Sequence, residues 1–78
     1  MNKKRRKKVS ALVERVAKII SDIEALEAKE KDDFDNLPEN ILSGQKGADM
    51  EAAIIALQEA MENSEAVIEN LNQSLGSI

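Results

Sequence analysis

A repeating apolar pattern over residues 50–78 constrains the fold of this chain more than any other feature. A helix with a single apolar stripe is not stable alone in water, so the rest of the chain has to cover it. The pattern has the alternating four- and three-residue spacing of one stripe along a packed α-helix. Ser64 is the one hydroxyl in the pattern, and its members are Met50, Ile54, Leu57, Met61, Ser64, Ile68, Leu71, Leu75 and Ile78. A hydroxyl there suits a choice of register, or a bond back to the backbone one turn earlier.

A second stripe with the same spacing lies near the start of the chain. Its members are Val9, Leu12, Val16, Ile19, Ile23 and Leu26, and Val13 and Ile20 widen it on one side. The next positions of this spacing are Glu30 and Asp33, in a stretch that is almost wholly charged. The pattern therefore predicts a first helix over about residues 10–35.

Residues 36–47 have the composition of a connection between two helices. Pro38 cannot continue a helix, but with Asn36 as a preceding cap it can open a short helical turn over residues 38–42. Ser43 is placed to cap the second helix, predicted over about residues 44–75, and Gly44 and Gly47 would loosen its first turn.

Two helices of similar length with a short connection predict an all-α antiparallel hairpin that resembles a coiled coil. The stripes then meet in six layers: Leu26–Leu57, Ile23–Met61, Ile19–Ser64, Val16–Ile68, Leu12–Leu71 and Val9–Leu75. Four apolar side chains remain outside this seam, and we expect them to form an interface between copies: Val13, Ile20, Ile55 and Val67. The expected assembly is a four-helix bundle or a larger homo-oligomer.

The composition argues against catalysis and against a bound cofactor. The chain contains no cysteine and no histidine, which removes thiolate and imidazole metal sites together with the usual nucleophile and base. The acidic residues Asp32, Asp33, Asp35 and Glu39 do not have the spacing of a calcium loop. No apolar run reaches the length of a membrane span and the basic start lacks the apolar core of a signal peptide. We therefore expect a cytoplasmic protein without enzymatic activity.

Charge is distributed very unevenly along the chain. The net charge is −4, yet eight of the eleven basic residues fall within residues 1–18. Six consecutive cations are unfavourable at the start of a helix, so residues 1–9 are predicted to be a flexible basic arm. Two alternatives are a contact with anionic lipid and a contact with the phosphates of nucleic acid through Lys3, Lys4, Arg5, Arg6, Lys7 and Lys8.

The connection is the best candidate for a specific binding site. Its glycines, its hydroxyl and its lysine lie at a predicted helix start, where backbone amides favour an anion. Two asparagines add neutral hydrogen-bonding groups for a base or a partner backbone. The candidate ligand- or partner-binding residues are Asn36, Asn40, Ser43, Gly44, Lys46 and Gly47. The alternative is a cap and connection without a ligand.

The same connection carries a resemblance to a family. The segments Phe34-Asp35-Asn36-Leu37-Pro38-Glu39-Asn40, Ser43-x-x-Lys46-Gly47 and Met50-Glu51-x-Ala53-Ile54-x-x-Leu57 resemble a pattern in small, mostly uncharacterised helical proteins of phages and prophages of Gram-positive bacteria. The resemblance implies an accessory protein of a mobile element. Together with the composition, it leads us to expect a self-associating protein that inhibits a host factor or sequesters a nucleotide signal. The alternative is a nucleic-acid-associated accessory protein that uses the basic arm.

Overall fold

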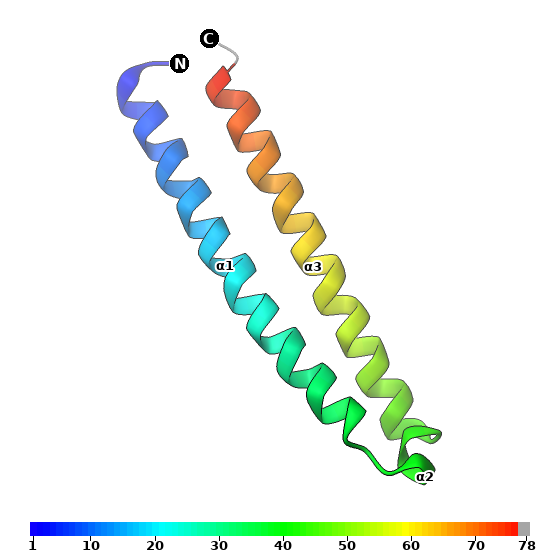
Figure 1. Cartoon of the computed structure of the whole chain (residues 1–78). Coiled ribbons are helices and arrows are strands. Elements are labelled where there is room, and N and C mark those ends of the chain that lie inside the picture. The colour runs from blue at the N-terminus through cyan, green and yellow to red at the C-terminus, as the bar shows by residue number, and fades with distance from the viewer. Residues whose placement is uncertain (77–78) are drawn as a thin grey trace.

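The computed structural model describes residues 1–76, which form a long antiparallel hairpin (Figure 1). Its helices are α1 (Lys3–Asp35), α2 (Glu39–Leu42) and α3 (Gln45–Gly76). The long helices α1 and α3 run side by side, α2 lies at the bend, and the start of α1 and the end of α3 lie at the opposite end of the hairpin. The Cα atoms span 59 × 16 × 12 Å. The predicted all-α hairpin is confirmed, and Ile78 of the predicted stripe lies outside the described residues.

Helix α1 begins at Lys3 and not near residue 10, so residues 3–9 of the predicted flexible arm are helical. Asn2 caps this helix, because its Oδ1 accepts a hydrogen bond from the backbone N of Arg5 at 2.9 Å. Asparagine is among the best residues for this role. The six cations remain unfavourable for the dipole of α1, but they lie at the same end of the hairpin as the last turn of α3 (Figure 1). The carbonyl end of a helix attracts cations, which offsets part of that cost.

The seam between the long helices differs from the prediction on the α1 side. Half-buried residues of α1 follow one unbroken pattern: Val9, Val13, Val16, Ile20, Ile23, Glu27, Glu30 and Phe34. On α3 the predicted stripe from Met50 to Leu75 is half-buried or buried throughout, and Ile54 is its most enclosed member at 9% exposure. The prediction was wrong for Leu12, Ile19 and Leu26, which are 41, 50 and 59% exposed.

One contact between the helices shows their register to within about one residue. Gln58 Nε2 donates a hydrogen bond to Glu27 Oε1 at 3.3 Å, and both helices rise about 1.5 Å per residue. Val16 therefore comes level with Ile68 and Ile23 with Met61, as predicted. In the alternate layers α1 is shifted by one residue, so that Ile20 lies level with Ser64 and Val13 with Leu71. Ser64 Oγ donates to the carbonyl oxygen of Ala60 at 2.7 Å, which confirms the predicted bond to the preceding turn.

Phe34 accounts for this choice of seam. Val13, Ile20, Glu27 and Phe34 are seven residues apart and therefore share one row of the helix. A seam that includes the half-buried ring of Phe34 has to include Glu27 as well. The competing row through Leu12, Ile19 and Leu26 leads to Asp33 instead.

The bend is shorter than predicted. Asn36 ends α1, Pro38 precedes α2, and the backbone N of Ile41 donates to the carbonyl oxygen of Pro38 at 2.9 Å. Ser43 was predicted to cap the second helix. Instead it ends α2, with its backbone N bonded to the carbonyl oxygen of Glu39 at 3.1 Å and its Oγ 3.5 Å from the carbonyl oxygen of Asn40. Helix α3 starts at Gln45, so the connection spans residues 36–44 rather than 36–47.

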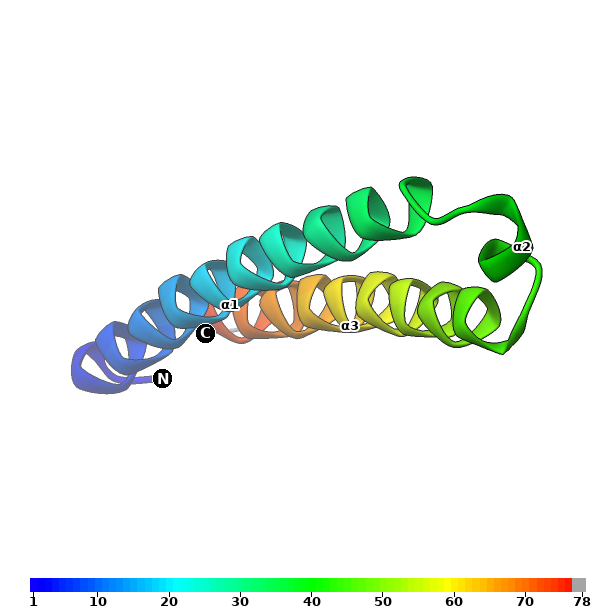
Figure 2. The same ribbon diagram turned by 90° about the horizontal axis from the view of Figure 1, so that it is seen from below.

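Gly47 lies beneath the end of α2 and is one of two buried residues of α3. A Cβ at this position would stand 2.6 Å from the carbonyl carbon and 2.9 Å from the Cα of Leu42. No side chain fits in that space, so glycine allows α2 to pack directly on the first turn of α3 (Figure 2). The predicted loose helix start is in fact a tight junction between two helices.

Candidate interaction surfaces

Three large apolar side chains form an exposed row along α1. Leu12, Ile19 and Leu26 recur at intervals of seven residues, so they lie one above another on the helix surface. All three are exposed in the hairpin. A row of this length is more than the scattered apolar exposure that is normal on a protein surface.

A row on α3 continues this surface. Ala53, Ala60, Val67 and Ser74 each immediately precede a seam residue of α3, just as Leu12 and Ile19 immediately precede Val13 and Ile20. In an antiparallel helix pair, rows related in this way meet on one side of the seam. Val67 is 45% exposed, whereas Ala60 and Ser74 are half-buried. We call the surface made by Leu12, Ile19, Leu26 and Val67 the apolar face.

The other side of the hairpin is acidic. By the same spacing, Glu24 of α1 and Glu51, Glu62, Glu65 and Glu69 of α3 lie on that side, and all are exposed. Among residues 1–76 the one ion pair is Lys18–Asp22 at 2.7 Å, within α1. The glutamates of α3 therefore do not pair with the basic start of α1.

The structure does not bring the four predicted interface residues onto one surface. Val13 and Ile20 are half-buried in the seam of the hairpin. Val67 belongs to the apolar face, whereas Ile55, which is 48% exposed, lies on the acidic side. Sequence reasoning missed Leu12, Ile19 and Leu26 as surface residues because it assigned them to the seam. The signal that separates the two rows is the residue at which each one ends. The row of Leu12, Ile19 and Leu26 continues at the same seven-residue interval to the charged Asp33, whereas the neighbouring row ends at the apolar Phe34.

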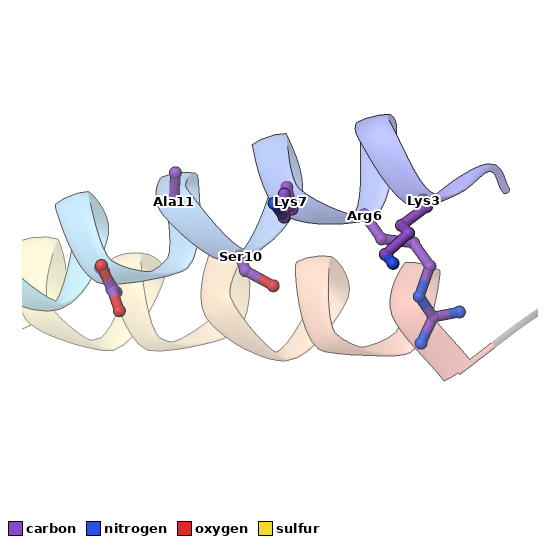
Figure 3. A pocket seen from close by; sticks show the side chains of 6 residues that line it. Lys3, Arg6, Lys7, Ser10 and Ala11 are labelled. Carbon is purple, nitrogen blue, oxygen red and sulfur yellow. The ribbon is translucent and has the colours of Figure 1, made fainter.

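A basic depression lies along the first turns of α1 (Figure 3). It has a volume of about 470 Å³ and is lined by Lys3, Arg6, Lys7, Ser10, Ala11 and Glu14. The side chain of Arg6 extends toward the last turn of α3, and Ser10 also points toward that helix (Figure 3). Three cations and a hydroxyl suit a phosphate or carboxylate ligand, although the carboxylate of Glu14 opposes an anion at one end. Lys4, Arg5 and Lys8 of the predicted cluster do not line this depression.

The predicted loop site divides into structural and exposed residues. Gly47 is covered by Leu42, and Ser43 is used to end α2. All the candidates except Gly47 are exposed: Asn36, Asn40, Ser43, Gly44 and Lys46. In the described part of the chain, no three acidic side chains lie close enough together to hold a metal ion.

The chain matches no family model, no curated protein and no solved structure. Within residues 1–76, none of the helices has both the length and the hydropathy needed to cross a bilayer. The apolar face, the basic depression and the exposed loop residues are the surfaces that this hairpin offers to a partner.

Proposed function

We propose that this chain is a non-catalytic helical hairpin that associates with itself and acts by binding. The observation that carries the proposal is the apolar face, which stays uncovered in a single hairpin. One two-helix layer encloses little apolar surface, and Ile54 is the one buried side chain among the large apolar residues of the described chain, residues 1–76. Chains of this size commonly gain stability by association. Packing two apolar faces together gives a four-helix bundle.

The same kind of surface suits a protein partner. An amphipathic helix binds a groove or another helix through anchors at intervals of three, four and seven residues, and Leu12, Ile19 and Leu26 have such intervals. From the resemblance at the connection, we propose that the chain is a phage or prophage accessory protein and that its partner is a host factor, which it inhibits. Sequestration of a nucleotide signal would use phosphate-binding groups such as those around Arg6.

The mass of the purified protein in solution tests self-association. Because the chain has neither Trp nor Tyr, light scattering should be combined with refractive-index detection. We expect a mass at least twice the monomer value of 8.6 kDa at micromolar concentration. A mass of one chain over that concentration range would contradict the proposal.

A second candidate function is nucleic-acid association, and the basic depression favours it. Lys3, Arg6 and Lys7 lie on one side of α1, and a helical scaffold holds them at fixed spacing. Cations that contact phosphates release counterions and give salt-dependent affinity. Residues 1–76 contain one aromatic side chain, Phe34, which is half-buried, so base stacking does not contribute and the contact would be with the backbone.

A further inference from the structure

We infer that the partner of the apolar face is a second copy of this chain that runs in the opposite direction, with α1 against α1 and a twofold axis level with Ile19. The inference rests on the proposed self-association and adds its orientation and register. It follows from the order of exposed residues along α1, from the neighbouring residues of α3 and from the distribution of charge between the two ends of the hairpin.

The exposed row of α1 has matching ends. At seven-residue intervals it reads Arg5, Leu12, Ile19, Leu26 and Asp33, and all five side chains are exposed. When two such rows run antiparallel about Ile19, the isoleucines meet each other and each Leu12 meets Leu26 of the second copy. Each Arg5 then meets Asp33 of the second copy. The row is thus apolar at its centre and complementary in charge at both ends.

Helix α3 fits the same axis. In the register of the contact between Glu27 and Gln58, Val67 comes within one residue of the level of Ile19, so Val67 also lies close to the axis. The smaller Ala60 and Ser74 come equally close to the levels of Leu26 and Leu12. On both sides of the twofold axis, the apolar face therefore carries its larger side chains on α1 and its smaller ones on α3. On the outer side of the α3 row lie the uncharged residues Ala56, Asn63 and Asn70, so two copies of α3 do not repel each other there.

The charges at the two ends of the hairpin decide the orientation. Lys3 to Lys8 are six consecutive cations at the open end, whereas Asp32, Asp33, Asp35 and Glu39 lie at the bend. A dimer with both bends at one end would place like charges side by side at both ends. The antiparallel dimer places each basic end beside the acidic bend of the other copy. Like charges brought together are penalised and opposite charges select the register.

Distance measurement between spin labels tests the orientation. The chain has no cysteine, so Lys46→Cys, at an exposed position near the bend, carries a single label. At about 1.5 Å per residue, the antiparallel dimer separates the two labels by about 60 Å. A dimer with adjacent bends places them within about 30 Å, because helix axes in a bundle are about 10 Å apart. The short distance would overturn the orientation and leave self-association intact, whereas a protein without dimers would overturn both proposals.

Charge reversal tests the register. Arg5→Asp and Asp33→Arg should each weaken dimerisation by about tenfold, because each breaks two symmetry-related exposed pairs. Both changes favour the dipole of α1, so weaker dimerisation does not result from loss of the helix. The double variant should regain wild-type dimerisation, and Lys4→Asp, on another side of α1, is the matched control. A double variant as weak as the single variants, or an equal loss in the control, would overturn the register.

Discussion

Leu42 lies with its backbone directly against Gly47, which joins the end of α2 to the first turn of α3 without an intervening side chain. This contact sets the position from which α3 returns along α1. It also gives a structural reason for a glycine at position 47, in the first turn of α3, where glycine lowers the stability of the helix. The glycine of the Ser43-x-x-Lys46-Gly47 segment is thus a packing residue.

Gly47→Ala should lower the free energy of unfolding by about 1–3 kcal/mol, because the new methyl group forces α2 away from α3. The higher helix propensity of alanine, worth about 1 kcal/mol, does not offset this clash. Chemical unfolding followed by circular dichroism at one fixed protein concentration measures the change. Gly44→Ala is the control, since its Cβ would lie at an ordinary 3.4 Å from the carbonyl oxygen of Ile41. A Gly47→Ala protein as stable as Gly44→Ala would contradict the tight junction.

Glu27→Leu should raise the free energy of unfolding by about 1 kcal/mol, because it places apolar surface in a half-buried seam position. The hydrogen bond from Gln58 that it removes is long, at 3.3 Å, and joins exposed atoms. Glu24→Leu, at an exposed position one turn earlier, should change stability by less than about 0.5 kcal/mol. The comparison uses the same unfolding measurement. Loss of stability in Glu27→Leu would place the seam of α1 elsewhere.

The sequence predicted the helices, the hairpin and the register of Val16 with Ile68. It did not identify which of two adjacent apolar rows on α1 faces α3, because Leu12 and Val13 both keep the required spacing. That choice depends on Phe34 at the far end of the helix. It also requires the charged Glu27 to lie in the seam, which a pattern based on local hydrophobicity does not predict. The candidate sites were less predictable for the same reason. A residue that leaves the seam, such as Ile19, becomes a surface residue only once the partner helix is placed.

The helical start of α1 shows a second limit of sequence reasoning. Six cations at a helix N-terminus argue for fraying. Two features act against it: the cap at Asn2, which is local, and the adjacent end of α3, which is a tertiary contact. Asn2 was a usable signal, because asparagine is a preferred cap. The nearness of the α3 terminus depends on the hairpin as a whole.

If the basic depression binds phosphates, Arg6→Gln combined with Lys7→Gln should reduce the salt dependence of binding to a DNA or RNA duplex by about two counterions. Lys4→Gln combined with Lys8→Gln removes the same charge outside the depression and should have a smaller effect. Fluorescence anisotropy of a labelled duplex over a salt series measures both. Equal effects of the two pairs would show that the depression is not a site, and no binding at low salt would remove nucleic acid as a partner.

Ile20→Glu should destabilise the hairpin itself by about 2–3 kcal/mol, because it puts a charge in the seam level with Ser64. Its neighbour Ile19 is exposed, so Ile19→Glu should leave the helical content of the chain nearly unchanged. Chemical unfolding followed by circular dichroism distinguishes the two variants when both are measured at a concentration where they are monomeric. Equal loss of stability in both would contradict the assignment of adjacent residues to the seam and to the surface.

The solution mass of Ile19→Glu tests the central claim, that the apolar face joins copies of this chain, most directly. Light scattering should give a folded protein with the mass of one chain, 8.6 kDa, where the wild type has at least twice that mass. Ile55→Glu, which adds the same charge on the acidic side, should keep the wild-type mass. A folded Ile19→Glu protein with the wild-type mass would contradict the claim.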